Sequence, residues 1–233
     1  MLRQICLSGK TIDYRLRRGL RKSVGLKINC GGLLVSAPNG LSGAEIDAIV
    51  RNKADWVLKN LVAWQNKIAL NPVAGFDHDN AVYPLLGSDW KPEISAWGQI
   101  GMVPAAGNEV VRQACQLPHQ AIERWIMAWY QQHATACFSE RIALYADKLS
   151  IPKPAYKLSQ AKTRWGSCSS SGMIRLNWRL IQIPLHLIDY VVAHELCHLI
   201  EMNHSRAFWD CVAAIYPEYQ QARRELNRYS LEP

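Results

Sequence analysis

The hydrophobic and polar positions change their period along the chain, and the changes predict its elements. Over residues 11–37 apolar and polar residues alternate, which is typical of half-buried β-strands. Over residues 42–66 the apolar positions follow helical spacing, and a capping box at 42–45 opens this segment. Residues 72–113, rich in glycine, proline and turn residues, predict short strands and loops. Residues 1–117 are therefore predicted to form a β-rich N-terminal region with one helix.

The second half of the chain predicts a different sequence of elements. A long helical pattern starts at Pro118 and continues to about Lys148. Residues 156–180 alternate on both sides of a Ser/Gly-rich turn and predict an antiparallel strand pair. An apolar helix follows Pro184, and a closing helix begins near Ser205. Residues 118–233 are thus predicted to be a separate domain, and the whole chain to be of the α+β class.

The apolar helix carries the motif H-E-x-x-H, formed by His194, Glu195 and His198. Residues four apart on a helix lie on one face, about 5–6 Å apart between Cβ atoms. Two imidazoles so placed can hold one Zn²⁺, and the glutamate can act as the acid/base for a metal-activated water. The alternative is a chance match on a core helix. The apolar surroundings favour the metal site, because buried imidazoles and carboxylates need partners.

Zinc requires a third protein ligand, and His204 is the favoured candidate. It lies six residues after His198, so it reaches the same side only if the helix ends between them. Asn203 can end the helix, because asparagine tolerates the left-handed conformation. Two glutamates of the last helix are the rival ligands, Glu218 and Glu225.

Composition and charge set limits on the function. The chain has 233 residues, and no apolar run approaches the roughly 20 residues of a membrane helix. Seven cysteines without a C-x-x-C pair, and an N-terminus without a signal-peptide core, favour reduced thiols in a cytoplasm. The net charge of +8 favours an anionic partner. Five basic residues around the first predicted hairpin are either a solvated face, the favoured interpretation, or a nucleic-acid contact: Arg15, Arg17, Arg18, Arg21 and Lys22.

Four motifs occur in one order over residues 162–209: RWGSC from Arg164, LNWR from Leu176, HELCH from His194, and NHS followed by FW from Asn203. With them the sequence resembles the YgjP-like family of metal-dependent hydrolases, which is grouped with the WLM and SprT-like zinc proteases. The resemblance implies a zincin-like metallopeptidase domain, made of the long helix, the strand pair, the HExxH helix and the closing helix. It also implies one zinc ion per chain.

The resemblance further implies a role for each motif residue. The metal ligands would be His194, His198 and His204, and the catalytic acid/base would be Glu195. In zincins an edge strand before the metal helix pairs with an extended peptide substrate, which here would be part of residues 156–180. The substrate-binding candidates are Arg164, Trp165, Gly166, Asn177 and Arg179, although core packing is the favoured role of Trp165. We expect Glu201 or Asp210 to orient the histidines.

Three functions fit these residues. The first is a zinc metallopeptidase acting on a peptide or protein. The second is a hydrolase of nucleoside triphosphates such as UTP, because four cations near the motifs can hold phosphates: Lys162, Arg164, Arg175 and Arg179. The third is a DNA-associated protease, by similarity to the SprT-like proteins, docked through the basic residues near the N-terminus.

Overall fold

The computed structural model describes residues 2–29, 32–65, 68–69, 82–94, 99–106 and 119–231. The chain forms two compact units, residues 1–68 and residues 69–231. The division therefore comes earlier than the predicted one at 117/118. The reason is that residues after 82 contribute to the core of the second unit, as described below. Much of the predicted loop region, residues 70–81 and 107–118, lies outside the described residues.

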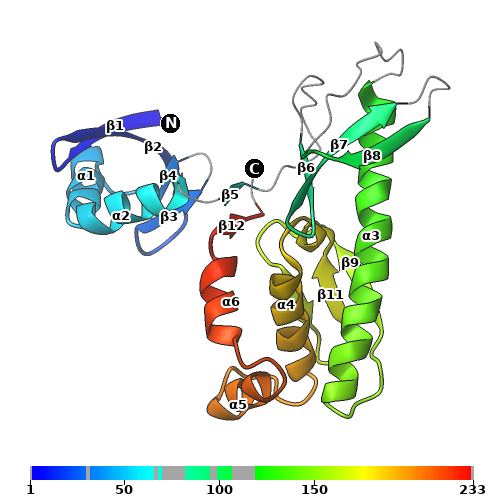
Figure 1. Ribbon diagram of the computed structural model, residues 1–233. Coiled ribbons are helices and arrows are strands. Elements are labelled where there is room, and N and C mark those ends of the chain that lie inside the picture. Colours follow the sequence, from blue (N-terminus) through cyan, green and yellow to red (C-terminus); the bar gives the residue numbers. More distant parts are fainter. Residues whose placement is uncertain are drawn as a thin grey trace. The chain divides into compact units, whose positions relative to one another are not determined.

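The first unit contains a four-stranded sheet with the order β1-β2-β4-β3 (Figure 1). Pairs β1/β2 and β3/β4 are antiparallel, whereas β2 and β4 run parallel. The predicted strands at 11–37 are present, but β4 lies between the two that were expected to be neighbours. The first strand was not predicted. The strands are β1 (Leu2–Leu7), β2 (Lys10–Gly19), β3 (Gly25–Asn29) and β4 (Gly32–Pro38).

Two helices, α1 (Gly43–Arg51) and α2 (Ala54–Gln65), stand where one helix over 42–66 was predicted. The capping box is confirmed, since the Glu45 amide donates to Ser42 Oγ at 3.3 Å and the Ser42 amide donates to Glu45 Oε2 at 2.7 Å. The break follows α1, where the Lys53 amide donates to the Val50 carbonyl at 3.1 Å, a tighter bond than an α-helix makes.

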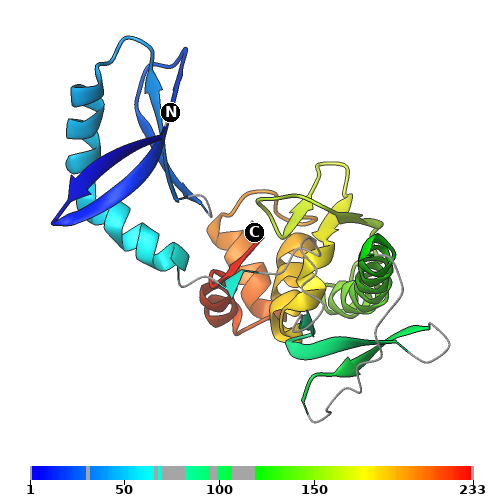
Figure 2. The ribbon, with the colours of Figure 1, turned by 90° about the horizontal axis from the view of Figure 1, so that it is seen from above.

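Both helices cover the same face of the sheet (Figure 2). Alternate strand residues point into the core that they share with the helices. Tyr14 of β2 donates to Asp47 of α1 at 2.5 Å, and Arg3 of β1 pairs with the same carboxylate at 3.0 Å. The core is formed by Ile5, Leu7, Tyr14, Leu16, Ile28, Leu33, Val35, Ala37, Ile46, Val50 and Val57.

The second unit begins with short strands. Strand β5 (Ile68–Ala69) stands at the division between the units in sequence. Strands β6 (Tyr83–Leu85), β7 (Ser88–Ile94) and β8 (Ile100–Pro104) form an antiparallel sheet. Tyr83 and Leu85 are buried in the large core of this unit, which explains why the hairpin belongs to it.

The long helix α3 (His119–Lys148) is confirmed over 30 residues. Its buried stripe packs against α4 and the 3₁₀-helix described below. At its end the chain enters the proline-containing segment 151–154, which cannot continue a helix. The stripe is formed by Ile122, Ile126, Tyr130, Ala134, Phe138 and Ile142.

The predicted antiparallel strand pair is a three-stranded sheet with the order β10-β11-β9. Strand β11 (Ile174–Asn177) is antiparallel to β10 (Gly166–Cys168) but parallel to β9 (Tyr156–Ser159). The prediction of one continuous strand before the turn was therefore wrong. The side-chain Nδ2 of Asn177 donates to the carbonyls of Ala161 at 2.7 Å and Arg164 at 3.3 Å. These bonds hold a turn that separates β9 from β10.

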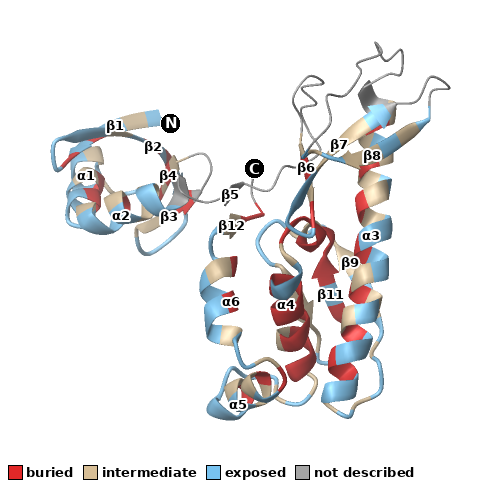
Figure 3. Ribbon diagram, in the orientation of Figure 1, coloured by how far each residue is buried: buried red, intermediate tan, exposed pale blue. Residues whose placement is uncertain are grey.

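The remaining elements enclose helix α4 (Leu185–Cys197). It contacts α3, α5, α6 and the sheet, and Figure 3 shows its residues mostly buried. Pro184 is its N-cap, as its sequence position suggested. No described helix has the length and hydropathy to span a membrane. The other elements are the 3₁₀-helix η1 (Trp178–Gln182), α5 (Arg206–Ile215), α6 (Tyr219–Leu226) and β12 (Tyr229–Ser230).

Candidate metal centre

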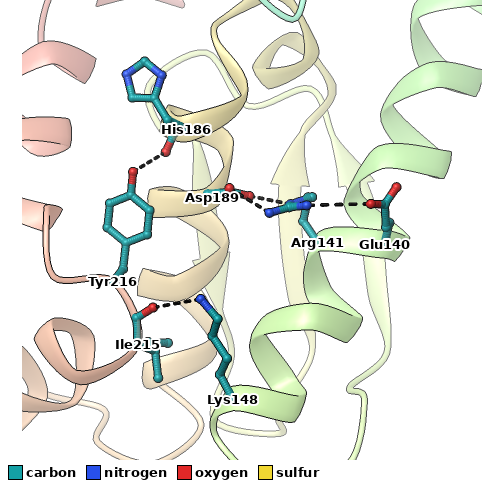
Figure 4. Close-up of polar contacts among 7 residues, drawn as sticks. All are labelled: Glu140, Arg141, Lys148, His186, Asp189, Ile215 and Tyr216. Carbon is teal, nitrogen blue, oxygen red and sulfur yellow. Dashed lines mark hydrogen bonds and ion pairs between the residues drawn. The ribbon is translucent and has the colours of Figure 1, made fainter.

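Helix α4 brings two of the three predicted ligands to its C-terminal end. His194 lies in its last turn, and His198 is its C-cap residue. A bidentate ion pair holds this helix against α3: Arg141 Nε lies 2.5 Å from Asp189 Oδ1 and Nη2 lies 2.8 Å from Oδ2 (Figure 4). The pair joins residues 48 positions apart, and sequence reasoning did not find it. It fixes the helix from which the histidines project.

The start of α4 is tied to the last helices. Tyr216 donates its hydroxyl hydrogen to the His186 carbonyl at 2.9 Å (Figure 4). The His186 ring is 3.0 Å from Glu225 Oε2. His186 precedes His194 by eight residues, or roughly 12 Å along the helix. This contact holds the rival ligand Glu225 near the other end of α4, and the second rival, Glu218, is an exposed N-cap residue of α6.

The chain turns directly after α4 and returns the third histidine to its end. The amides of Ile200 and Glu201 donate to the Cys197 carbonyl at 3.0 and 2.9 Å. The prediction that Asn203 adopts the left-handed conformation is wrong. The described non-glycine residues with a positive φ are Ser8, Leu86 and Ser150, and Asn203 is not among them. The Asn203 amide instead donates to Glu201 Oε1 at 3.3 Å. The Ser205 N-cap is confirmed, since its Oγ accepts from the Phe208 amide at 3.3 Å.

The three imidazoles converge with a geometry that suits a metal ion. One ligand atom each from His194, His198 and His204 lies within 4.8 Å of the others. The Nε2 atoms of His194 and His204 are 3.1 Å apart. Two nitrogens at the Zn–N distance in a tetrahedral site would be roughly 3.3 Å apart. The arrangement therefore fits zinc without a rearrangement of the backbone.

Aromatic rings and one carbonyl orient the histidines. Phe208 stacks on His198 at 4.5 Å between ring centroids, and Trp209 stacks on His204 at 5.7 Å. His198 Nδ1 is 3.2 Å from the Glu201 carbonyl, which leaves Nε2 for a metal. The expectation that a carboxylate of Glu201 or Asp210 orients the ring is not what the structure shows. The orienting group is the backbone carbonyl of Glu201, and Asp210 is an exposed partner of Arg206 at 3.8 Å.

Burial keeps His194 neutral and raises the pKa of Glu195. Loss of solvent lowers the pKa of His194 to about 3, and it lowers the pKa of His198 as well. A neutral imidazole is the form that binds a metal. Burial raises the pKa of Glu195 to about 7, opposed by the nearby charge of Arg164. The carboxyl group can therefore exchange a proton near neutral pH.

Gly166 of β10 lies directly against the Glu195 side chain. A Cβ atom at this glycine would come within 2.5 Å of Glu195 Oε1 and 2.7 Å of its Cγ. Gly166 was a substrate-binding candidate, and the structure places the Glu195 side chain against it. Among the described strands β10 is at the edge of its sheet, so the glycine places the carboxylate next to an edge strand.

The other substrate-binding candidates occupy different environments. Arg164 is exposed and acts electrostatically on Glu195. Trp165 packs against the large core, which fits the favoured interpretation. Asn177 is fully buried, and its amide holds the turn before β10. The Arg179 guanidinium lies 4.7 Å from the Trp178 ring centroid, and its buried Nε has no hydrogen-bond partner among the described residues.

Helix α6 adds a cation that sequence reasoning did not find. The Arg223 guanidinium lies 5.0 Å from the Trp209 ring centroid, and Tyr219 stacks on the same ring at 5.4 Å. The Arg223 charge also contributes to the lowered pKa of His194. The i, i+4 spacing of Tyr219 and Arg223 was the available signal, because it places both on one helix face. Arg223 is a candidate for contact with negative charge on a substrate.

Comparison with known proteins adds the family. A search of curated proteins finds no match. The chain is similar to the crystal structure of the metallopeptidase zymogen of Pyrococcus abyssi abylysin, with 22% identity and a TM-score of 0.36. That match covers 39% of this chain and 93% of the other. The family model described as "YgjP-like, metallopeptidase domain" matches residues 22–229, nearly the whole sequence, and the chain therefore belongs to the YgjP-like family.

Proposed function

We propose that this protein is a zinc-dependent metallopeptidase that uses Glu195 as its catalytic acid/base. One observation carries the proposal: three imidazole nitrogens converge within 4.8 Å next to a buried glutamate that contacts an edge strand. Membership of a metallopeptidase-domain family supports it. A zinc-dependent hydrolase of peptides needs metal ligands and a nearby acid/base.

The three histidines would hold about one zinc ion per chain, because imidazole nitrogens suit this metal. A bound zinc ion would supply a Lewis acid that polarises a carbonyl group and acidifies water. The chain's own contribution is to keep the ligands neutral and in place. Burial of His194, the carbonyl contact of His198 and the ring stacking on His204 serve this role.

Glu195 would take a proton from the attacking water and pass it to the leaving amine. Its pKa of about 7 supports both directions of transfer near neutral pH. Its position is determined on one side by α4 and on the other by Gly166. The positive charge of Arg164 favours the ionised form, which accepts the proton.

Strand β10 would bind the substrate. It pairs with β11 on one side and has no strand partner on the other among the described residues. An extended peptide can add to such an edge through main-chain hydrogen bonds. Because Gly166 in this strand touches Glu195, a peptide paired there would run beside the catalytic carboxylate. This arrangement favours a peptide over a nucleotide.

The nucleotide alternative depends on cations that are spread over several elements. Lys162 and Arg164 are exposed in the turn before β10, and Arg175 is exposed on β11. Arg179 is engaged with the Trp178 ring. Of these four side chains, Arg164 is the one whose charge lowers the pKa of Glu195. A nucleoside triphosphate such as UTP is therefore included in the test as the competing substrate.

The test compares purified wild-type protein with Glu195→Gln on mixed unstructured peptides and on UTP. Gln has nearly the same size but cannot accept a proton, so we expect peptide cleavage to fall about 10²–10⁴-fold. Zinc content should be unchanged, because Glu195 is not a proposed ligand. If the protein cleaved UTP but no peptide, the peptidase proposal would be wrong and the nucleotide hydrolase would take its place. Full peptide cleavage by Glu195→Gln would contradict the proposed mechanism.

A further inference from the structure

The net charge of the chain is confined to its first unit. Residues 1–68 contain twelve lysines and arginines and four aspartates and glutamates, so this segment has a net charge of +8. Residues 69–233 contain fifteen of each sign and are neutral. The whole chain's charge of +8 therefore belongs to the smaller unit, which contains none of the proposed catalytic residues.

Much of this charge lies on the sheet face that α1 and α2 leave uncovered, here called the outer face. Strand residues alternate between the two faces, and the core residues mark the inner one. On the outer face Arg15 of β2 and Lys27 of β3 flank Leu34 of β4 in one cross-strand row. In the next cross-strand row, Ser36 of β4 lies between Arg17 of β2 and Gly25 of β3.

Arg21 extends this basic surface. A Cβ atom at Gly25, an outer-face position, would come within 2.7 Å of Arg21 Nη2. The Arg21 guanidinium therefore reaches over the outer face, where its Nε donates to the Ser23 carbonyl at 2.6 Å. Four cations, Arg15, Arg17, Arg21 and Lys27, are thus held on one sheet framework.

The two central arginines form no ion pair with a described residue. Arg15 and Arg17 are exposed, and no carboxylate of the described residues forms an ion pair with either. Other arginines of the same unit are engaged: Arg3 pairs with Asp47 at 3.0 Å, and Arg18 donates to the Asn39 carbonyl at 3.1 Å. Asp13 of β2 is the acidic residue at an outer-face position of the described strands, and Arg15, Arg17 and Lys27 outnumber it, so the outer face keeps a positive net charge.

We propose that the outer face of the β1–β4 sheet binds the phosphate backbone of duplex DNA. Arginine guanidinium groups match phosphate oxygens, and strand geometry holds Arg15 and Arg17 about 6.8 Å apart. The outer-face positions of the described strands hold no aromatic residue, so the face offers no platform on which unpaired bases could stack. Contact with phosphates alone gives binding without sequence preference. The inference concerns residues 1–68 and does not rest on the proposed hydrolysis.

The experiment measures binding of the full-length protein to a fluorescein-labelled 20-base-pair duplex of mixed sequence. With about four phosphate contacts, affinity should fall roughly 100-fold between 50 and 200 mM salt. Arg15→Glu/Arg17→Glu should weaken binding more than about 10-fold and reduce the salt slope by about two. Arg15→Gln/Arg17→Gln, which removes the charges without reversing them, should give a smaller loss.

The matched control is Lys53→Glu/Lys59→Glu. It changes the charge of the same unit by the same amount, but Lys53, in the turn between α1 and α2, and Lys59, on α2, are exposed on the helical side of the sheet. The DNA affinity of this control should stay within about threefold of the wild-type value. A change of that size is expected from the altered net charge alone. Equal losses in both glutamate variants, or no binding at 50 mM salt, would overturn the proposal. Tighter binding to phosphatidylserine vesicles, lost in the same arginine variants, would assign the face to a membrane instead.

Discussion

The two units of the chain use polar residues in opposite ways. In the smaller unit, the polar and charged side chains of the described residues are not buried, except that of Tyr14. Its excess positive charge is exposed. The larger unit is neutral, and its described residues include six buried polar or charged side chains: Asn177, Gln182, Asp189, Glu195, His198 and Ser230. Burial changes the pKa and the hydrogen bonding of such groups, whereas exposure leaves charge available to solvent.

The two units therefore have different roles: the larger unit contains the proposed catalytic site, and the smaller unit presents the positive charge that would attract a partner. In the larger unit, the buried polar groups hold the metal helix, shape the turn before β10 and set the basicity of Glu195. In the smaller unit the core is apolar, and the charged groups lie outside it. Substitutions in the larger unit should therefore change activity or stability strongly. Comparable substitutions in the smaller unit should have local and smaller effects.

The largest expected change in stability comes from Arg141→Ala. It leaves the nearly buried Asp189 carboxylate without its cationic partner, and breaking such a pair costs about 3–5 kcal/mol. Hydrogen exchange resolved by segment should show the loss in residues 69–231 and little change in residues 1–68. The double variant Arg141→Met/Asp189→Leu removes both charges and should be less destabilised than Arg141→Ala. If the two variants were equally unstable, the unpaired charge would not be the cause.

An intermediate effect is expected from Gly166→Ala. The new methyl group would clash with Oε1, Cγ and Cδ of the buried Glu195, so the whole side chain must shift and stability should fall by about 1–3 kcal/mol. A misplacement of about 1 Å can cost roughly 10²-fold in rate, and we expect a loss of turnover of this size. Gly101→Ala is the matched control, because a Cβ atom there meets nothing within 4 Å. Equal activity of the two alanine variants would show that the glycine does not position Glu195.

The smallest effects come from two serine N-caps with the same geometry. Ser42 Oγ and Ser205 Oγ each accept from a backbone amide at 3.3 Å. Each Ser→Ala change should cost about 1 kcal/mol. In Ser42→Ala the cost should remain in residues 1–68, with zinc affinity unchanged. In Ser205→Ala, next to His204, zinc affinity in a chelator competition should fall about fivefold. A change of zinc affinity in Ser42→Ala would contradict the separation of the two units.

Local signals allowed much of the fold to be predicted. The capping box at Ser42, the N-cap at Ser205 and the extent of the long helix α3 depend on neighbouring residues alone, and all three are confirmed. The H-E-x-x-H spacing likewise predicted that His194 and His198 share one end of a helix. These features could be found because a helix brings together residues three or four positions apart.

Contacts between distant residues could not be predicted in this way. The parallel pairing of β9 with β11 depends on the turn that Asn177 holds, and alternation alone does not distinguish it from a longer antiparallel strand. The Arg141–Asp189 pair and the approach of Gly166 to Glu195 likewise arise from tertiary packing. The position of β4 between β2 and β3 has the same origin, because strand order is not encoded in the period of either strand.

The zinc content of the purified chain tests the central claim most directly. Untagged protein prepared without chelator should contain about one zinc ion per chain by elemental analysis. His204→Ala should lose most of it, whereas Glu225→Ala, which removes the partner of His186, should retain it. Protein that binds no transition metal even after zinc is added, or a Glu225→Ala variant that loses zinc while His204→Ala keeps it, would contradict the account.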